Sequence, residues 1–286
     1  MESDMGTDKV QSIPTPNENQ LAESGYTYYE MVNTPLTAIS VILNGLILLF
    51  ILSSPRLRKQ HNIFTFNMAL IDLTSAVISL LGMYDSQPRP LYNASWNSCT
   101  AVSTLNILLV AIYRFVTVQV DPFGVNNLVT TPRCIVACIL AWMTGFFPLY
   151  VELILSENRI GVPLSICILL LFILTGLSYT LLYTSVTRTG AGVNDLRLKE
   201  NRQLLKTFAA IYVTSFSLWM PLCVYGLSNK LNTTWYRIGN LSYNTNLIAN
   251  PVIYWVRSNE FKATVKTCVG YHHRSQVQAV HVIDAV

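Results

Sequence analysis

The chain has 286 residues, of which 51% are hydrophobic and only 12% are charged, and its formal net charge is +4. In soluble domains about a quarter of the residues are charged, so this chain has too few charged residues to cover a water-exposed globule of its size. The composition excludes an ordinary soluble enzyme and predicts a single polytopic membrane domain.

Seven apolar stretches follow one another along the chain, each long enough for a helix that crosses a bilayer, which takes about 20 residues. They are Met31–Leu52, Ile63–Tyr84, Leu91–Gln119, Cys134–Leu155, Val162–Val186, Leu204–Leu227 and Tyr236–Val256. The seventh is the most polar, because Arg237 and several asparagines interrupt it, and we expect those side chains to face the bundle interior. The predicted fold is all-α: a seven-transmembrane helix bundle over 31–256, between a tail over 1–30 and a cytoplasmic segment over 257–286.

The basic residues predict the orientation. The N-terminal tail and the even-numbered gaps between stretches hold five Lys and Arg residues, whereas the odd-numbered gaps and the C-terminal segment hold fourteen. Because Lys and Arg collect on the cytoplasmic side, we expect the N-terminus outside the cell and the C-terminus inside. The tail has no apolar core and is not expected to be a cleaved signal peptide. Asn93 and Asn232 begin glycosylation triplets in or beside the predicted outer loops.

Proline and polar motifs interrupt the apolar stretches. Asn250-Pro-Val-Ile-Tyr254 stands near the end of the seventh, where the proline removes a backbone hydrogen bond and kinks the helix. We expect the neighbouring Asn and Tyr to refill the freed groups or to hold water. The sixth carries Trp219-Met-Pro221, and the second carries Asp72, a carboxyl that is costly at membrane depth unless paired or solvated. The third ends with Arg114 at the cytoplasmic boundary.

The residues after the seventh stretch predict a short amphipathic eighth helix on the inner membrane surface. It would run from Trp255 to Lys262 and on through Thr264, with Cys268 placed for palmitoylation. The alternative is a proline kink followed by a basic tail.

In this order along the helices, these motifs resemble the rhodopsin-like (class A) G-protein-coupled receptors over about residues 31–270. The matching residues are Asn44, Ala69 with Asp72, Arg114, Trp142, Trp219 with Pro221, and Asn250 to Tyr254. The resemblance implies a multi-pass plasma-membrane receptor that passes the binding of an extracellular ligand to a heterotrimeric G protein. A non-signalling decoy receptor is the alternative within the fold. A transporter is disfavoured, because one deep carboxyl and no internal repeat are visible.

The resemblance also implies roles for individual residues. A polar pocket that holds an allosteric sodium ion corresponds to Asp72, Ser103, Asn246 and Asn250. Leu247 stands where the family usually has a serine, which would weaken this site. A purely structural alternative has Asp72 bonded to Asn44 and water.

The same resemblance implies a second set of residues for G-protein coupling and activation. They are Tyr113, Arg114, Phe115, Trp219, Pro221, Asn250, Pro251 and Tyr254. Tyr113 replaces the acid that normally pairs with the arginine, and Asn201 at the base of the sixth stretch is uncharged. We therefore expect a loose resting state and high basal activity. Tyr179 and Tyr183 are both candidates for the inward tyrosine of the fifth stretch.

The third stretch and the cysteines depart from the family. Counting back from Arg114 puts Arg89 at the family's disulfide position, and counting forward from Asp72 puts Cys99 there. We favour a helix that starts near Leu91, with no disulfide. Cys99 and Cys167, like the three other cysteines of the stretches, are then expected to be buried free thiols.

The expected ligand is small and apolar or odorant-like. Trp96 stands where amine receptors have a carboxylate, which disfavours a monoamine. The candidate cavity residues are Trp96, Glu152, Trp219, Tyr225 and Tyr243, although an interfacial belt is the alternative role for such aromatics. No HExxH or GxSxG motif occurs, so we expect no enzymatic activity and no cofactor beyond sodium. The basic segment Thr187–Asn201 suits a G protein or membrane lipid as partner rather than nucleic acid.

Overall fold

The computed structural model describes residues 18–84, 89–121, 127–147, 161–188, 195–228, 233–258, 261–265 and 267. Within these ranges the fold is helical throughout and contains no strand. The helices are α1 (Glu18–Ser53), α2 (Asn62–Tyr84), α3 (Arg89–Phe115), α4 (Thr131–Gly145), α6 (Gly161–Arg188), α7 (Asp195–Leu227) and α8 (Thr233–Arg257). A 3₁₀ turn (Pro55–Leu57) follows α1, and a π-helical turn (Val116–Val120) extends α3.

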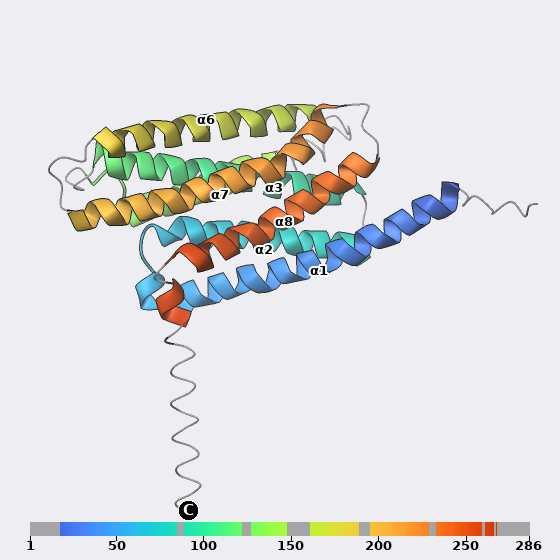
Figure 1. The fold of residues 1–286 in the computed structure, drawn as a ribbon, viewed down its shortest axis with the longest axis horizontal. Coiled ribbons are helices and arrows are strands. Elements are labelled where there is room, and N and C mark those ends of the chain that lie inside the picture. Colours follow the sequence, from blue (N-terminus) through green and yellow to red (C-terminus); the bar gives the residue numbers. More distant parts are fainter. Residues whose placement is uncertain are drawn as a thin grey trace, which may run out of the picture.

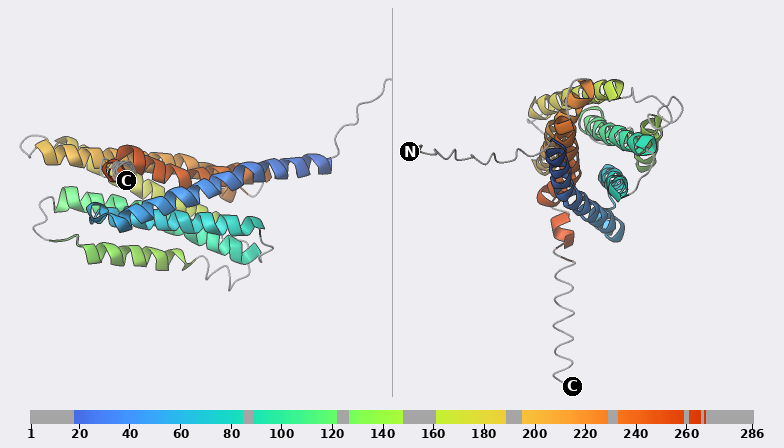
Figure 2. Two further views of the ribbon diagram at one scale, coloured as in Figure 1. Left: turned by 90° about the horizontal axis from the view of Figure 1, so that it is seen from below. Right: turned by 90° about the vertical axis from the view of Figure 1, so that its right-hand side faces the viewer.

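The helices lie alongside one another in a bundle (Figure 1). Seen along its length in the right-hand view of Figure 2, they surround a common interior. α3 packs against α2, α4, α6 and α7, while α1 packs against α2 and α8 and so closes the bundle on the other side. Residues from the two halves of the chain therefore meet in the interior.

The surface of this bundle is that of a membrane protein. Five helices are long and apolar enough to cross a bilayer by length and composition, over Glu30–Ser53, Asn62–Gly82, Ala94–Val120, Val162–Thr184 and Leu205–Leu227. Large apolar side chains stand exposed on the outside, such as Met143 on α4, which is 70% exposed. Soluble monomers rarely expose such continuous apolar surfaces.

The two remaining helices differ from these five. α4 is apolar but has only 15 residues, and residues 148–155 of the fourth predicted stretch lie outside the described residues. α8 has 25 residues but contains two arginines and four asparagines. As expected from the sequence, Asn244, Asn246 and Asn250 are buried in the interior, whereas Arg237 and Asn240, which we also expected there, are only partly buried. The count of seven spans stays a prediction.

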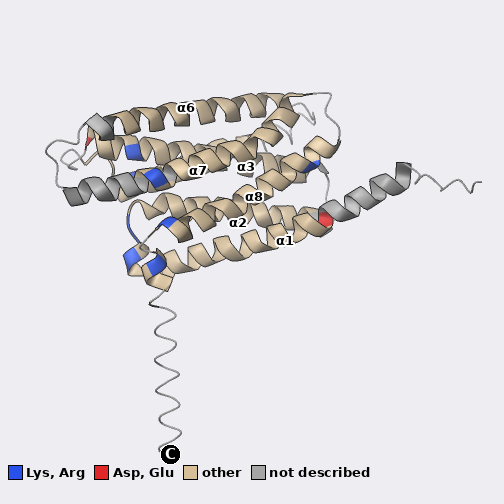
Figure 3. Cartoon of the chain, viewed as in Figure 1, with Lys and Arg blue, Asp and Glu red and all other residues tan. Residues whose placement is uncertain are grey.

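Charge is distributed unevenly along the bundle. Figure 3 shows Lys and Arg gathered at the end where α1, α3 and α8 end and where α2 and α7 begin. Arg56, Arg58 and Lys59 belong to this end, and Arg237, near the start of α8, lies toward the other. One end of the bundle is therefore strongly basic.

Two helix boundaries bear on the predictions. α3 begins at Arg89, two residues before the expected Leu91, with Pro90 in its first turn, where a missing N–H costs little. α8 continues to Arg257, so the expectation that a separate surface helix starts at Trp255 is wrong. The Trp255 ring instead packs against Phe50 of α1, with ring centroids 5.7 Å apart.

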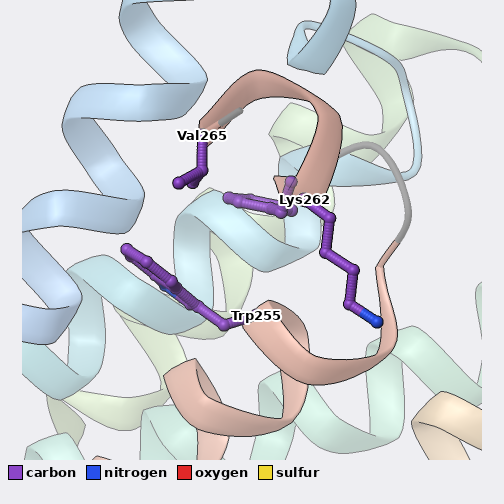
Figure 4. Close-up of a pocket in the computed structure, with 4 residues that line it drawn as sticks. Trp255, Lys262 and Val265 are labelled. Atoms are coloured by element: carbon purple, nitrogen blue, oxygen red, sulfur yellow. The ribbon is translucent and has the colours of Figure 1, made fainter. Parts of the chain in front are cut away.

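A short helical segment does follow α8, over residues 261–265. Phe261 and Thr264 are buried while Lys262 is exposed, which gives it an apolar and a polar face. A hollow of about 210 Å³ lies between this segment and the end of α8, lined by Trp255, Phe261, Lys262 and Val265 (Figure 4).

Gly145 sets the distance between α3 and α4. A Cβ atom at this position would lie 2.1 Å from Val102 Cγ2 and 3.0 Å from the Val102 backbone nitrogen. Only glycine allows this approach, as small residues do between membrane helices in general.

Candidate functional site

The centre of the bundle is polar. Asp72 on α2 is fully buried, and Asn250 Nδ2 on α8 donates a hydrogen bond of 2.9 Å to Asp72 Oδ2. A buried carboxyl without such a donor would be strongly destabilising. This bond joins two of the motif residues that the sequence singled out, 178 positions apart.

The proline of α8 explains a second set of bonds. Pro251 has no N–H, so the carbonyl of Leu247, four residues earlier, loses its helical donor. Asn44 Nδ2 on α1 donates to this carbonyl at 3.0 Å, and Ser40 Oγ lies 3.4 Å from it. Side chains of α1 thus satisfy the freed carbonyl. The expectation that the Asn and Tyr beside the proline would do so is wrong.

The structural alternative for Asp72 was a carboxyl bonded to Asn44 and water, and its expected partner Asn44 is wrong. Asn44 bonds to Leu247 and to its own helix, at the Ser40 carbonyl and hydroxyl, whereas Asp72 bonds to Asn250. Asn44 and Asp72 therefore make two separate contacts, and both contacts are with α8.

Several buried side-chain oxygens in the interior of the bundle have no hydrogen-bond partner among the described residues. They are Asp72 Oδ1, Asn44 Oδ1, Ser103 Oγ, Asn246 Oδ1 and Asn250 Oδ1. One carboxylate with neutral amide and hydroxyl oxygens is the ligand chemistry of a hard cation. The residues predicted for sodium therefore fit such an ion chemically, although Leu247, buried beside them, supplies no side-chain oxygen.

Arg114 lies at the basic end of the bundle and is 6% exposed. Its guanidinium carbon lies 5.2 Å from the centre of the Tyr113 ring, and that ring lies 5.1 Å from the Phe64 ring on α2. Arg114 thus makes a cation–π contact with Tyr113, the residue that stands where rhodopsin-like receptors have an acid. Tyr254 is also buried and interacts with Thr65 on α2.

An aromatic column joins α3, α7 and α8. The Tyr243 ring lies 4.9 Å from that of Trp96 on α3 and 5.1 Å from that of Trp219 on α7, centroid to centroid. Trp219 is completely buried, and Tyr243 lies between the two tryptophans. Three of the predicted cavity residues are therefore brought together, but they contact one another.

The other predicted cavity residues lie elsewhere. Tyr225 packs against Tyr236, with centroids 5.4 Å apart, and does not join the column. Glu152 lies outside the described residues. The structure therefore brings together only part of the expected ligand site.

Two further polar links join the helices, and sequence reasoning missed both. Trp142 Nε1 on α4 donates to Asn67 Oδ1 at 2.8 Å, and Asn67 Nδ2 donates to Asn106 Oδ1 on α3 at 2.8 Å. Asn244 Nδ2 on α8 donates to Asn33 Oδ1 on α1 at 2.6 Å. The available signal was an isolated amide inside an apolar stretch, which predicts an interior polar contact without naming its partner.

On α6, the structure decides between the two candidate tyrosines. Tyr179 is buried and packs against Tyr212 of α7 at 5.7 Å, whereas Tyr183 is 63% exposed. Phe172 of α6 also packs against Phe216 of α7, and Tyr212 Oη donates to the Phe172 carbonyl at 3.0 Å. The α6–α7 contact is thus largely aromatic.

The cysteines of the described residues form no disulfide. Cys99, Cys134, Cys138 and Cys223 are buried free thiols, as expected. Cys167 is also free, but the expectation that it is buried is wrong, because it points away from the interior of the bundle.

Other predicted sites fall outside the described part of the chain. They are Asn232, Glu152 and Cys268, and the side chains of Asn93 and Asn201. Among the described residues, no three His, Cys, Asp or Glu side chains are grouped as a metal site would require.

A comparison with known protein families found no matching family model, and a comparison with characterised proteins found no significant match.

Proposed function

We propose that this chain is a receptor of the rhodopsin-like G-protein-coupled type, with seven membrane-spanning helices and a short eighth helix. One observation carries the proposal. Asn44, Asp72 and Asn250, which the sequence singled out independently, belong to contacts between α1, α2 and α8 across 178 and 203 positions. An accidental motif match gives no reason for its residues to meet in the interior of one bundle.

The basic end of the bundle supports the proposed orientation. Lys and Arg gather where α1, α3 and α8 end, and this end faces the cytoplasm under the positive-inside rule. The N-terminus is then extracellular, and the protein resides in the plasma membrane. Arg114 lies at the cytoplasmic end, where a G protein docks.

The aromatic column supports a small apolar ligand. Trp96, Tyr243 and Trp219 present aromatic rings and no charged group, and Trp96 offers no counter-charge to an amine. Trp219 is completely buried and Trp96 is only partly buried, so an entering ligand contacts Trp96 before Trp219, and Tyr243 contacts both rings. The ligand signal therefore passes through Tyr243.

Ligand-free nucleotide exchange tests the proposal. The purified receptor in lipid nanodiscs is mixed with each class of heterotrimeric G protein, and the GTP uptake rate is measured. We expect exchange above the rate of the G protein alone, and we expect Arg114→Gln to remove the increase. Arg237→Gln, the same charge change toward the opposite end of the bundle, is the matched control. Equal exchange by wild type and Arg114→Gln contradicts the proposal, and no exchange with any class identifies a non-signalling receptor.

Tyr113 tests the restraint on Arg114. Replacing Tyr113 with Asp supplies an ion pair in place of the ring contact, and each such pair is worth on the order of 1–3 kcal/mol, a five- to hundredfold change in population. Tyr113→Asp should lower basal exchange, while Tyr113→Phe, which keeps the ring, should leave it near wild type. An unchanged or raised rate in Tyr113→Asp contradicts this role.

A further inference from the structure

A hollow unrelated to the polar centre opens on the side of the bundle at its basic end. It has a volume of about 580 Å³ and lies against the end of α1, the 3₁₀ turn, the first half of α2 and most of α4. Small-molecule sites in proteins have volumes of this order, about 300–1,000 Å³. We call it the α2–α4 groove.

The walls of the groove are apolar and accessible from the side. Leu70 on α2 is 36% exposed, and Ile135 and Ile139 on α4 are 45% and 55% exposed. Trp142 lines the deep end of the groove, where its Nε1 is already bonded to Asn67. These walls offer dispersion contacts and no unpaired indole donor to an occupant.

The mouth of the groove is basic. Arg58 and Lys59, both exposed, line it directly after the 3₁₀ turn, and none of the described residues that line it is acidic. Arg58 donates one hydrogen bond to the carbonyl of Leu52, which holds its side chain near the end of α1. A guanidinium has five donors in a planar fork, so donors remain for a phosphate.

We propose that the α2–α4 groove binds one anionic phospholipid, with its phosphate at Arg58 and Lys59 and one acyl chain along Leu70, Ile135 and Ile139. The inference depends on the membrane arrangement and orientation of the proposed function. Basic pockets between membrane helices on the cytoplasmic side suit anionic headgroups, because anionic lipids are concentrated in that leaflet. A sterol uses the same apolar walls but has no anionic group to interact with Arg58 and Lys59.

Native mass spectrometry of the full-length receptor in detergent tests the charge requirement. Phosphatidylserine and phosphatidylcholine with identical acyl chains are titrated separately, and the bound fraction of each is measured. We expect phosphatidylserine to bind at least about tenfold more tightly, and Arg58→Gln with Lys59→Gln to remove that preference. Arg56→Gln is the matched control, because Arg56 is an exposed neighbour that does not line the groove.

A second pair of variants tests the acyl-chain site. Ile139→Trp fills the groove and should weaken the binding of both lipids, whereas Leu140→Trp should not, because Leu140 is equally exposed but lies outside the groove. Both positions are on the lipid-facing surface, so neither change disturbs the interior.

Three outcomes overturn the proposal. Equal affinity for the two lipids removes the charge selectivity, and equal losses per charge removed in Arg56→Gln and in the Arg58/Lys59 variant assign the effect to general surface charge. Competition by a sterol, with no effect of the charge variants, makes the groove a sterol site. None of these results bears on G-protein coupling, because the measurement contains no G protein.

Discussion

Two sides of the bundle are joined by different kinds of contact. Between α1, α2 and α8, side-chain amides carry the contacts, in the bonds Asn44 to Leu247, Asn244 to Asn33, and Asn250 to Asp72. Between α6 and α7, aromatic rings carry them, with Phe172 and Tyr179 packed against Tyr212 and Phe216. Both sides face the same interior. The contacts on the first side are mainly directional hydrogen bonds, whereas those on the second are mainly ring packing.

The difference has a consequence for motion. A hydrogen bond between buried groups weakens steeply as its angle or length changes, so the amide contacts fix the register of α1, α2 and α8. Ring contacts keep most of their energy over offset and tilted arrangements, so α6 and α7 can slide against each other at little cost. We therefore expect the α6–α7 side to move during activation while the α1–α2–α8 side stays in place.

The largest expected effect comes from breaking the amide side at Asp72. Asn250→Leu leaves the buried carboxyl without its donor and should cost about 2–3 kcal/mol in stability. A fall in the thermal unfolding midpoint of the purified protein measures the loss. Thr245→Val, an exposed change on the same helix, is the control. Unchanged stability in Asn250→Leu would show that the Asp72 bond does not hold this side together.

The next effect concerns the proline carbonyl. Asn44→Ala removes a donor from the Leu247 carbonyl and should cost about 1–2 kcal/mol. In a Pro251→Ala background the backbone N–H returns, so the same change should cost at least about 0.5 kcal/mol less. Gly45→Ala is a nearly neutral control on α1, because its Cβ would meet nothing within 4 Å. Equal costs in both backgrounds would contradict the account of α8.

A sodium effect should be confined to the amide side. Replacing sodium with choline should destabilise the wild type by on the order of 1 kcal/mol and leave Asp72→Asn unaffected. It should also raise basal nucleotide exchange in the wild type alone. Equal responses of the wild type and Asp72→Asn in both measurements rule the ion site out.

A smaller effect is expected on the aromatic side. Tyr212→Phe removes the hydrogen bond to the Phe172 carbonyl but keeps the ring, and should cost less than about 1 kcal/mol. Gly176→Ala should have a comparable effect, since its Cβ would lie 2.5 Å from the Tyr212 hydroxyl and displace it. Unfolding midpoints measure both. A loss as large as that of Asn250→Leu would mean that the two sides are held equally tightly.

The smallest effect is expected from adding a reducing agent. Reducing agents should not change surface expression or stability, because Cys99 and Cys167 are both free. Cys167→Ser should be neutral at its exposed position, and Cys99→Ser should cost about 1–2 kcal/mol for a buried hydroxyl. Intracellular retention of either variant, reproduced by reductant on the wild type, would reveal a bridge between them.

The sequence by itself predicted most of the helical segments and the inward position of Asp72 and Asn250. Contiguous apolar length and the costly Asp72 and Asn250 are enough for that, because the bilayer imposes the same requirements on every segment. It also indicated where α8 loses a backbone bond, since Pro251 acts within its own helix. These features depend on residues that are neighbours in the chain.

Only the tertiary structure decided the partners. Tyr179 and Tyr183 lie on nearly the same face of α6, about 40° apart, and the rotation of the whole helix decides which is buried. The donor to the Leu247 carbonyl comes from α1, 203 positions away, and the partner of Asn33 lies 211 positions away on α8. Such pairings depend on how helices turn about their axes when they pack, and no local pattern in the sequence records that rotation.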